Sequence, residues 1–243
     1  MTPAKLRRTA VLLAGGKGTR LKPFTMSIPK PLLPVGDVPI VEVVIRQLAQ
    51  AGIERVVVTL GHLGPLFSAS LGNGEQFGVQ IEYCREEEPL GTAGPLTLID
   101  QLSDPVIVMN GDVLTTLDYS ALLDFHAKTG AAATIAVSKR NVFIDYGVVR
   151  VDGSDRLAGF DEKPNLKYEV SMGINVLSPE ARDMIPKGRK FDMPDLLKAL
   201  LAANKVVSCF RTDCYWQDIG RFDDYQQASA DFTADPDRFF RSR

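Results

Sequence analysis

An apolar run that passes directly into a glycine-rich turn is the feature that most constrains the fold of this chain. Residues 9–13 have the composition of a buried strand, and the turn that follows, residues 15–20, carries three glycines and the cations Lys17 and Arg20. A strand that ends in such a turn presents backbone N–H groups and fixed positive charge to phosphate oxygens. The sequence therefore predicts a polyphosphate site at the end of its first strand.

Two better-known phosphate loops do not fit this turn. The Walker pattern ends in Gly-Lys-Ser or Gly-Lys-Thr, whereas here Lys17 comes before the last glycine. The dinucleotide fingerprint needs a third glycine for close helix packing, and Leu21 stands there. A dinucleotide-dependent oxidoreductase is further disfavoured because Thr59, not an acidic residue, ends the second predicted strand. What remains is a strand and loop whose Lys17 and Arg20 approach a polyphosphate, with a solvated turn as the alternative.

Composition limits the partners and the compartment. The chain has 243 residues, 45% of them hydrophobic, and a net charge of −2, so its electrostatics do not favour nucleic acid as a partner. It has no run of 18 apolar residues, and the apolar run after its basic start is too short for a signal peptide, so we expect a cytoplasmic protein without membrane association. Three cysteines without metal-ligand spacing favour reduced thiols. The two histidines, His62 and His126, are too few for a histidine-based zinc site.

Apolar runs alternate with amphipathic stretches through the first half of the chain, and this order predicts an α/β fold with a doubly wound, mostly parallel Rossmann-like sheet. The predicted strands are residues 9–13, 55–59, 80–83 and 105–109, and the predicted helices are residues 38–50, 65–71, 93–102 and 117–128. Strands over residues 132–138, 146–151, 157–160 and 170–177 follow, and we expect them to form a small antiparallel sheet on the substrate side, as one wall of a cleft. Helices over residues 179–185, 192–203 and 222–232 and a strand over residues 206–210 complete the prediction.

Two carboxylates are candidate metal ligands. Asp112 follows the fourth predicted strand, at the sheet edge where ligands bind in open α/β folds, and Gly111 permits a tight turn before it. Asp218 comes from a distant segment, two residues after the only tryptophan. Two carboxylates together with phosphate oxygens and waters suit Mg²⁺. The alternatives are an Asx turn at Asp112 and a helix N-cap at Asp218.

Two further segments carry candidate ligand contacts. Lys163 stands between Glu162 and Pro164, where the proline fixes the local backbone, and it is either a phosphate ligand or a solvated lysine. Residues 89–95 open a predicted helix with small residues, whose bare backbone would lie flat against a base or a sugar. The alternative for this segment is an ordinary helix start capped by Thr92.

Taken in order, these elements resemble the sugar-1-phosphate nucleotidyltransferase (nucleotide-sugar pyrophosphorylase) family, and within it the short enzymes of the mannose-1-phosphate and heptose-1-phosphate guanylyltransferase type. The motifs that carry the resemblance are residues 15–21, 29–35, 90–95, 110–112, 162–164, Gly173 and residues 216–220. The resemblance implies a glycosyltransferase-A-like fold and a single nucleotidyltransferase domain over residues 1–243. Its parts would be a nucleotide-binding part to about residue 130, a sugar-binding part over about 131–220, and a C-terminal helix over about 221–243.

The resemblance also implies a reaction: a sugar-1-phosphate oxygen attacks the α-phosphorus of a nucleoside triphosphate, with Mg²⁺, and pyrophosphate leaves. The implied catalytic residues are Arg20 on the phosphates, Lys30 at the α-phosphate, Lys163 on the sugar phosphate, and Asp112, which with Asp218 would hold the metal. The implied nucleotide-binding residues are Leu13, Ala14, Gly15, Gly16, Lys17, Gly18, Thr19, Glu86, Pro89, Gly91, Thr92 and Gly111. The implied sugar-binding residues are Gly147, Glu162, Gly173 and Asn175. Such a transfer depends on positioning and charge, which fits a chain without a plausible nucleophilic triad.

The choice of nucleotide turns on Glu86. The segment around it resembles the guanylyltransferases, and a carboxylate accepts hydrogen bonds from the two adjacent donors of guanine, so we expect GTP. The alternatives are thymidylyl, uridylyl or cytidylyl transfer to glucose-1-phosphate or an amino sugar-1-phosphate. A non-catalytic regulatory subunit that binds nucleotide-sugars is an alternative of another class, disfavoured because the catalytic cations and both carboxylates are present. A homo-oligomer stays open.

Overall fold

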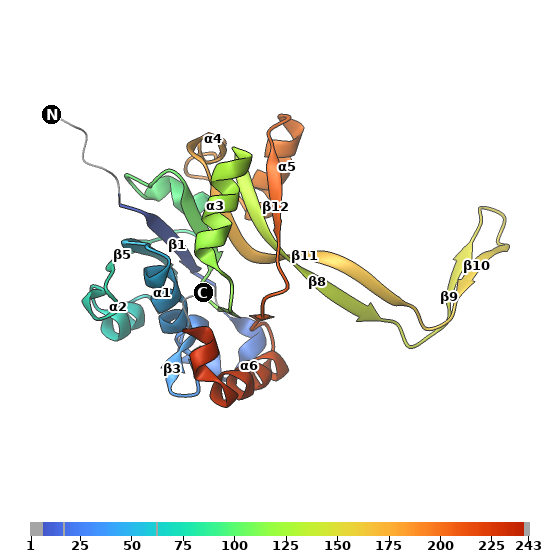
Figure 1. Cartoon of the computed structure of the whole chain (residues 1–243), viewed down its shortest axis with the longest axis horizontal. Helices are drawn as coiled ribbons and strands as arrows, with labels where there is room; N and C mark the ends of the chain where they lie inside the picture. The colour runs from blue at the N-terminus through green and yellow to red at the C-terminus, as the bar shows by residue number, and fades with distance from the viewer. Residues whose placement is uncertain (1–6, 17, 62, 241–243) are drawn as a thin grey trace.

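A mostly parallel seven-stranded sheet forms the centre of the molecule (Figure 1). The computed structural model describes residues 7–16, 18–61 and 63–240. The strands, in the order of the sheet, are β12 (Val207–Arg211), β8 (Ala133–Phe143), β11 (Asn165–Leu177), β6 (Val106–Asn110), β1 (Thr9–Ala14), β4 (Arg55–Leu60) and β5 (Gln80–Arg85). Strands β6, β1, β4 and β5 run parallel, whereas β11 is antiparallel to both β6 and β8.

Helices cover both faces of this sheet. One face carries α1 (Ile40–Gln50), α2 (Pro65–Leu71) and α3 (Tyr119–Thr129), and the other carries η5 (Gly94–Leu98), α4 (Pro179–Arg182) and α5 (Met193–Ala202). Because side chains alternate along a strand, Ala10 and Leu12 of β1 enter the first core and Val11 enters the second. The predicted doubly wound fold is confirmed. Among the helices of the described residues, none combines the length and apolarity needed to cross a membrane.

A third core joins the segment after the glycine-rich turn to the C-terminal helices. It packs Leu21 and Val35 against Phe232 of α6 (Phe222–Ala234) and Phe239 of η6 (Pro236–Phe239). The short elements around it and along the rest of the chain are η1 (Thr19–Leu21), η2 (Phe24–Met26), η3 (Lys30–Leu32), β2 (Pro34–Val35), β3 (Val38–Pro39), η4 (Glu75–Phe77), β7 (Val113–Thr115) and β13 (Trp216–Asp218). The C-terminal helix therefore supports the turn that the sequence assigns to phosphate.

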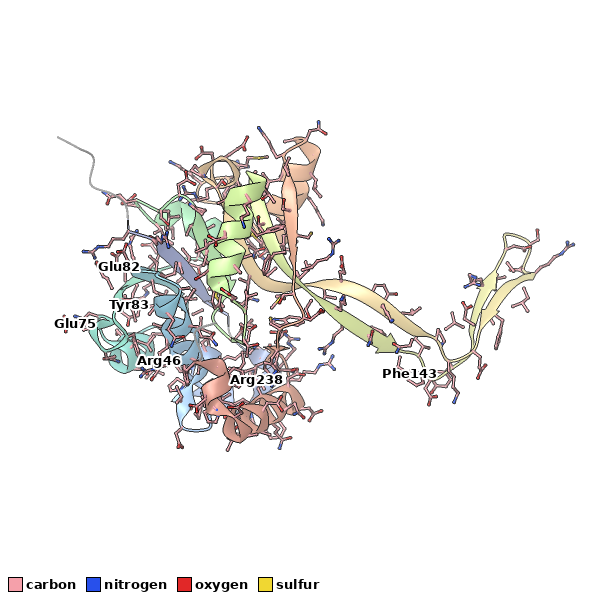
Figure 2. All side chains as sticks on the ribbon, in the orientation of Figure 1. Arg46, Glu75, Glu82, Tyr83, Phe143 and Arg238 are labelled. Carbon is pink, nitrogen blue, oxygen red and sulfur yellow. The ribbon has the colours of Figure 1, made fainter. Side chains whose placement is uncertain are left out.

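A small antiparallel sheet is present, as predicted, but it lies at the end of a longer ribbon. Strands β8 and β11 belong to the central sheet and continue beyond it as a two-stranded ribbon, which ends in the hairpin of β9 (Val148–Val151) and β10 (Leu157–Asp161). Figure 1 shows this ribbon leaving the body of the molecule, and Figure 2 places Phe143 far out along it. We call residues 138–170 the arm. The predicted strands end at residue 138 and begin again at residue 170, but the β8–β11 ladder continues beyond both residues. The arm therefore extends away from the body and does not form the expected wall of the cleft.

The predicted helix over residues 93–102 is also shorter than expected. Only the 3₁₀ helix Gly94–Leu98 forms. The backbone N–H groups of Ala93 and Gly94 both donate to the Phe191 carbonyl, which ties this segment to the loop before α5. Thr92 does not cap a helix of its own, because its hydroxyl accepts a hydrogen bond from the backbone N–H of Met193 at 2.7 Å, in the first turn of α5.

Candidate active site

A cleft of about 710 Å³ opens where β1, β4, β5 and β6 end. The carboxyl ends of parallel strands meet at one edge of an open sheet, so the loops that follow them share this space. The predicted residues that line it are Leu13, Ala14, Gly15, Gly16, Gly18, Thr19, Arg20, Lys30, Glu86, Pro89, Gly91, Thr92 and Asp112. Segments more than 90 residues apart thus meet here. Lys17, which was also predicted to bind the nucleotide, lies outside the described residues.

Close packing and a left-handed backbone account for two of the glycines at this cleft, Gly61 and Gly18. A Cβ at Gly61, after β4, would lie 2.5 Å from the Gly15 carbonyl oxygen, so the two loops touch through bare backbone. Gly18 has a φ of +58°, the left-handed conformation that favours glycine, and a Cβ there would lie 3.0 Å from the Thr25 side chain. The Thr25 hydroxyl donates to the Gly18 carbonyl at 2.8 Å. Gly15 and Gly18 are therefore held in place by these contacts, and both line the cleft.

A buried ion pair crosses the floor of the cleft. Lys30, in a 3₁₀ turn that also holds Pro31, extends Nζ to within 2.5 Å of the Asp112 carboxylate, and both side chains are largely buried. Asp112 is placed by Gly111, whose N–H donates to the Leu13 carbonyl at 3.0 Å. Gly111 itself is buried and does not line the cleft. A buried charge is stable only when it is paired, so each member of this pair fixes the other.

The second predicted metal ligand lies beside the first. Strand β13 pairs antiparallel with β7 and sets Asp218 opposite Val113, the residue after Asp112. Burial raises the pKa of the Asp218 carboxyl; the cations Lys30 and Arg20 lower it, and the Asp112 carboxylate raises it. Asp218 is not the N-cap that the alternative requires, because Arg221 precedes α6.

These two carboxylates fit a divalent cation. Two acidic side chains this close repel one another, because the Asp112 carboxylate raises the pKa of Asp218, and a cation between them would relieve that repulsion. Within the described ranges, no cluster of three or more His, Cys, Asp or Glu side chains suited to a metal occurs. The remaining ligands of a bound Mg²⁺ would therefore be phosphate oxygens and waters, which is its usual preference.

Glu86 lies against the glycine-rich turn and lines the cleft beside it. It follows β5, its Oε2 accepts the backbone N–H of Leu90 at 2.8 Å, and its Oε1 lies 2.9 Å from where a Cβ of Gly15 would stand. These contacts orient the carboxylate within the cleft. The arrangement leaves an acceptor beside the turn, where a ligand with adjacent N–H donors would meet it.

The predicted sugar-binding residues are not brought together. Gly173, with a φ of +71°, lies against the cleft residue Asn110, because a Cβ at Gly173 would stand 2.6 Å from Asn110 Nδ2. Asn175 is buried inside the sheet, where its Nδ2 donates to the Val108 carbonyl at 3.4 Å. The other predicted sugar contacts, Gly147, Glu162 and the catalytic candidate Lys163, lie on the arm and do not line the cleft.

Sequence reasoning missed several residues of the cleft. Those that also line it are Pro31, Thr59, Gly61, Arg85, Glu87, Asn110 and Lys190. Arg85, Glu87 and Asn110 adjoin predicted residues, so proximity in sequence would have found them. Lys190 arrives on the loop before α5, and no local pattern connects that loop to the glycine-rich turn.

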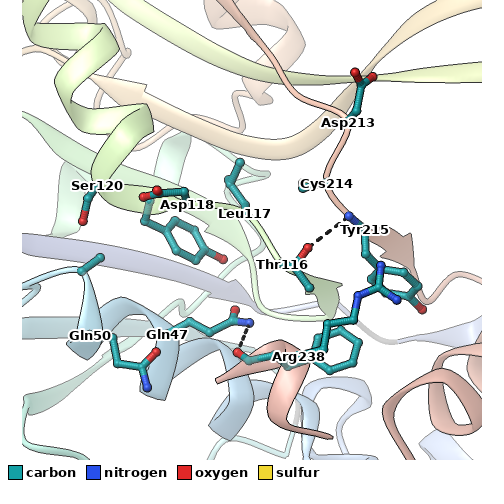
Figure 3. Close-up of a pocket in the computed structure, with 13 residues that line it drawn as sticks. Gln47, Gln50, Thr116, Leu117, Asp118, Ser120, Asp213, Cys214, Tyr215 and Arg238 are labelled. Carbon is teal, nitrogen blue, oxygen red and sulfur yellow. Dashed lines mark hydrogen bonds between the residues drawn. The ribbon is translucent and has the colours of Figure 1, made fainter. Parts of the chain in front are cut away.

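A second cavity, of about 430 Å³, lies between α1, α3 and the C-terminal end of the chain (Figure 3). Some of its polar groups hold the fold: Gln47 Nε2 donates to the carbonyls of Thr115 and Phe239, and the Arg238 guanidinium lies 4.8 Å from the centre of the Tyr215 ring. Of the glycine-rich turn, none of the residues that the structure describes lines it. The cleft, not this cavity, is therefore the candidate active site.

Comparisons with known proteins place this chain in a family. A family model described as nucleotidyl transferase matches residues 9–235. The chain is 37% identical over 228 residues to a mannose-1-phosphate guanylyltransferase of Mycobacterium tuberculosis, which covers 91% of this chain and 64% of that protein. It is 34% identical over 239 residues to a UTP–glucose-1-phosphate uridylyltransferase of Synechocystis sp., covering 90% of this chain and 62% of that protein. This chain therefore spans less than two thirds of the length of these curated relatives.

Solved structures show the same fold. The structure of HddC from Yersinia pseudotuberculosis complexed with GMP-PN superposes with a TM-score of 0.72 at 25% sequence identity, covering 93% of this chain and 99% of that one. UDP-glucose pyrophosphorylase complexed with UDP-glucose superposes with a TM-score of 0.71 at 19% identity, covering 94% of this chain and 99% of that one.

Proposed function

Since the chain belongs to the nucleotidyl transferase family, we propose that it transfers a nucleoside monophosphate from a nucleoside triphosphate to a sugar-1-phosphate, forming a nucleoside-diphosphate sugar and pyrophosphate. One observation carries the proposal: the glycine-rich turn, Arg20 and the Lys30–Asp112 pair share one cleft. GTP with mannose-1-phosphate or heptose-1-phosphate is the expected substrate pair.

Charge is the main obstacle to this reaction, because two phosphates must approach each other. In the proposed mechanism the backbone of Gly15, Gly16 and Gly18 faces the triphosphate. Arg20 neutralises the negative charge that develops on the triphosphate oxygens in the transition state. Lys30, held in place by Asp112, directs its ammonium at the α-phosphate. Fixed cations in a cleft of this kind stabilise the transition state more than flexible ones, because little reorganisation is needed when the reaction occurs.

Asp112 and Asp218 would hold the Mg²⁺. When bound, that ion supplies positive charge to the phosphate oxygens and orients them for in-line attack. The chain's own contribution is to hold the two carboxylates side by side through the β7–β13 ladder. No protein nucleophile is needed, because the sugar phosphate attacks the α-phosphorus directly.

Glu86 supports GTP as the nucleotide. Its carboxylate, oriented by the Leu90 N–H, would accept from the two donors on the Watson–Crick edge of guanine. The mannose-1-phosphate guanylyltransferase of M. tuberculosis is a 37% identical relative. Uridylyl transfer to glucose-1-phosphate is the second candidate, because a relative of that name is 34% identical.

The proposal includes the division of the chain made from the sequence. The nucleotide-binding part, to about residue 130, contains most of the cleft residues. The part over about residues 131–220 would bind the sugar, and the C-terminal helix packs below the turn. A cytoplasmic location without nucleic-acid or membrane partners stays a prediction.

Pyrophosphate release by the purified chain with Mg²⁺ tests this function. GTP, dTTP, UTP, CTP and ATP would each be combined with the 1-phosphates of glucose, mannose, N-acetylglucosamine and heptose. We expect one combination to dominate, with GTP as the nucleotide. Binding of nucleotide without release in any combination would contradict the proposal and favour a regulatory subunit.

A further inference from the structure

The arm exposes an unusual amount of apolar surface. Of the 17 large hydrophobic side chains that are exposed in the described part of the chain, nine lie between residues 142 and 168, including Tyr146 at 78% and Leu157 at 67%. Soluble proteins seldom leave contiguous apolar surface uncovered unless another surface binds there. A two-stranded hairpin also has no core of its own, so it needs a packing partner to be stable.

One face of the ribbon between body and tip carries this apolar character. Residues opposite each other in the β8–β11 ladder share a face, and here Val142 stands opposite Leu166 and Arg140 opposite Tyr168. The other face is mainly polar, with Lys139 opposite Glu169 and Asn141 opposite Lys167. An antiparallel sheet with one apolar face normally packs that face against a second layer. Among the described residues, nothing provides that layer.

Glu162 and Lys163 of the arm lie too far from the cleft of their own chain to contact a ligand there. Gly173, at the base of the arm, touches the cleft residue Asn110. From Ser171 the β8–β11 ladder is unbroken out to Asn165, which is six residue steps, or about 20 Å of extended chain. Glu162 and Lys163 lie beyond that point, farther than a lysine side chain reaches. Figure 1 shows the same separation between the tip and the body.

A second apolar surface borders the cleft. We call Phe24, Met26, Ile28 and Phe222 the rim patch; all four are exposed, and the rings of Phe24 and Phe222 stack with centres 5.7 Å apart. The first three stand between the cleft residues Arg20 and Lys30 in the sequence. Phe222 follows Gly220, which lies against the Arg20 guanidinium. A groove of about 760 Å³ runs from this stacked pair along α6.

We propose that two copies of this chain exchange arms, so that the apolar face of each arm covers the rim patch of its partner and brings Glu162 and Lys163 to the partner's cleft. A two-fold pair is self-complementary, because each chain carries both the arm and the rim patch. Lys163 is available for this role, since its 2.9 Å ion pair with Asp145 is exposed on both sides and contributes little. The part played by Lys163 rests on the proposed function, whereas the pairing of the two copies does not.

Mixing two inactive variants tests the exchange. Asp112→Asn disables a cleft and Lys163→Ala disables an arm; in a mixed dimer, the intact arm of the first chain would serve the intact cleft of the second. After the two are co-expressed or unfolded and refolded together, we expect pyrophosphate release at about a quarter of the wild-type rate, because half of randomly formed dimers are mixed and one of their two sites is complete. A rate no higher than that of the separate variants would overturn the proposal. A mixture of Asp112→Asn with Asp218→Asn is the matched control and should not recover, because both changes disable the cleft.

Sedimentation tests the pairing without any assay of activity. We expect the wild-type chain to sediment as a dimer at micromolar concentration. Because Phe143 and Asn165 are directly paired, replacing residues 144–164 by Asn-Gly closes the ribbon with a two-residue turn, and this chain should be a folded monomer. A monomeric wild type, or a dimer that survives the replacement, would overturn the exchange even if the wild type is an active enzyme. An inactive wild-type dimer that loses its pairing on replacement would refute the proposed function alone.

Discussion

The cleft and the arm differ in how they depend on the rest of the fold. The cleft gathers side chains that directly follow the ends of parallel strands, so the topology of the sheet brings Gly15, Glu86 and Asp112 together. The arm carries its candidate ligands about 20 Å along a ribbon, and the direction of that ribbon decides which cleft they serve. The comparison shows that a site built at a sheet edge follows from strand order, whereas a site that needs an extended hairpin also depends on what the hairpin packs against.

The largest expected effect lies in the cleft. Asp112→Asn removes both the partner of Lys30 and a candidate metal ligand, so we expect turnover to fall by about 10³-fold. The amide has the same shape, and circular dichroism should show an unchanged fold. Asp37→Asn, at an exposed position of the turn between β2 and β3, is the matched control. Turnover near the wild-type rate would remove Asp112 from the active site.

Truncating a side chain should lower the free energy of unfolding much more in the body than in the arm. Ile107 is fully buried in the core of the sheet, and Ile107→Ala should lower the free energy of unfolding by about 2–5 kcal/mol. Val149 is 55% exposed on the arm, and Val149→Ala should change it by less than about 0.5 kcal/mol. Urea unfolding at concentrations where the chain is monomeric measures both. Equal losses would mean that the arm packs on its own body.

A smaller effect concerns the choice of nucleotide. In Glu86→Gln one acceptor becomes a donor, which cannot pair with both guanine donors, so the kcat/KM for GTP relative to UTP should fall about tenfold. The backbone contact from Leu90 can persist through the remaining carbonyl oxygen. Glu88→Gln, which changes the same charge outside the cleft lining, is the control. If the ranking of nucleotides stays the same in both variants, Glu86 does not contact the base.

The smallest expected effect concerns a hydrogen bond that links the cleft to the base of the arm. Trp216 Nε1 donates to the Met172 carbonyl at 3.0 Å, so β13, which carries Asp218, is tied to the base of the arm. Trp216→Phe keeps an aromatic ring but loses this hydrogen bond, and we expect a loss of about 1 kcal/mol in urea unfolding followed by circular dichroism. Trp216→Leu would separate the ring from the hydrogen bond. An unchanged midpoint and slope in Trp216→Phe would show that the bond does not contribute.

The sequence predicted the fold well because the parallel half of the sheet is locally encoded. Apolar runs marked β1, β4, β5 and β6 to within about two residues, and strand ends then located the cleft. The pairing of Asp218 with Val113 was not predictable, because it depends on a three-residue ladder between segments about 100 residues apart. Lys190 was missed because its contact with the cleft likewise joins segments that are far apart in the sequence. The antiparallel strands were predicted, but the length of the arm was not, because alternating polarity identifies strands and does not say where the ladder between them ends.

Following the α-phosphate of GTP tests the central claim most directly. The purified chain would be given Mg²⁺, mannose-1-phosphate or heptose-1-phosphate, and GTP labelled at either the α- or the γ-phosphate. The account predicts that the α-label appears in a nucleotide-sugar and the γ-label in pyrophosphate, and that Asp112→Asn abolishes both. Release of the γ-label as inorganic phosphate, or its transfer to the sugar, would contradict nucleotidyl transfer at this cleft.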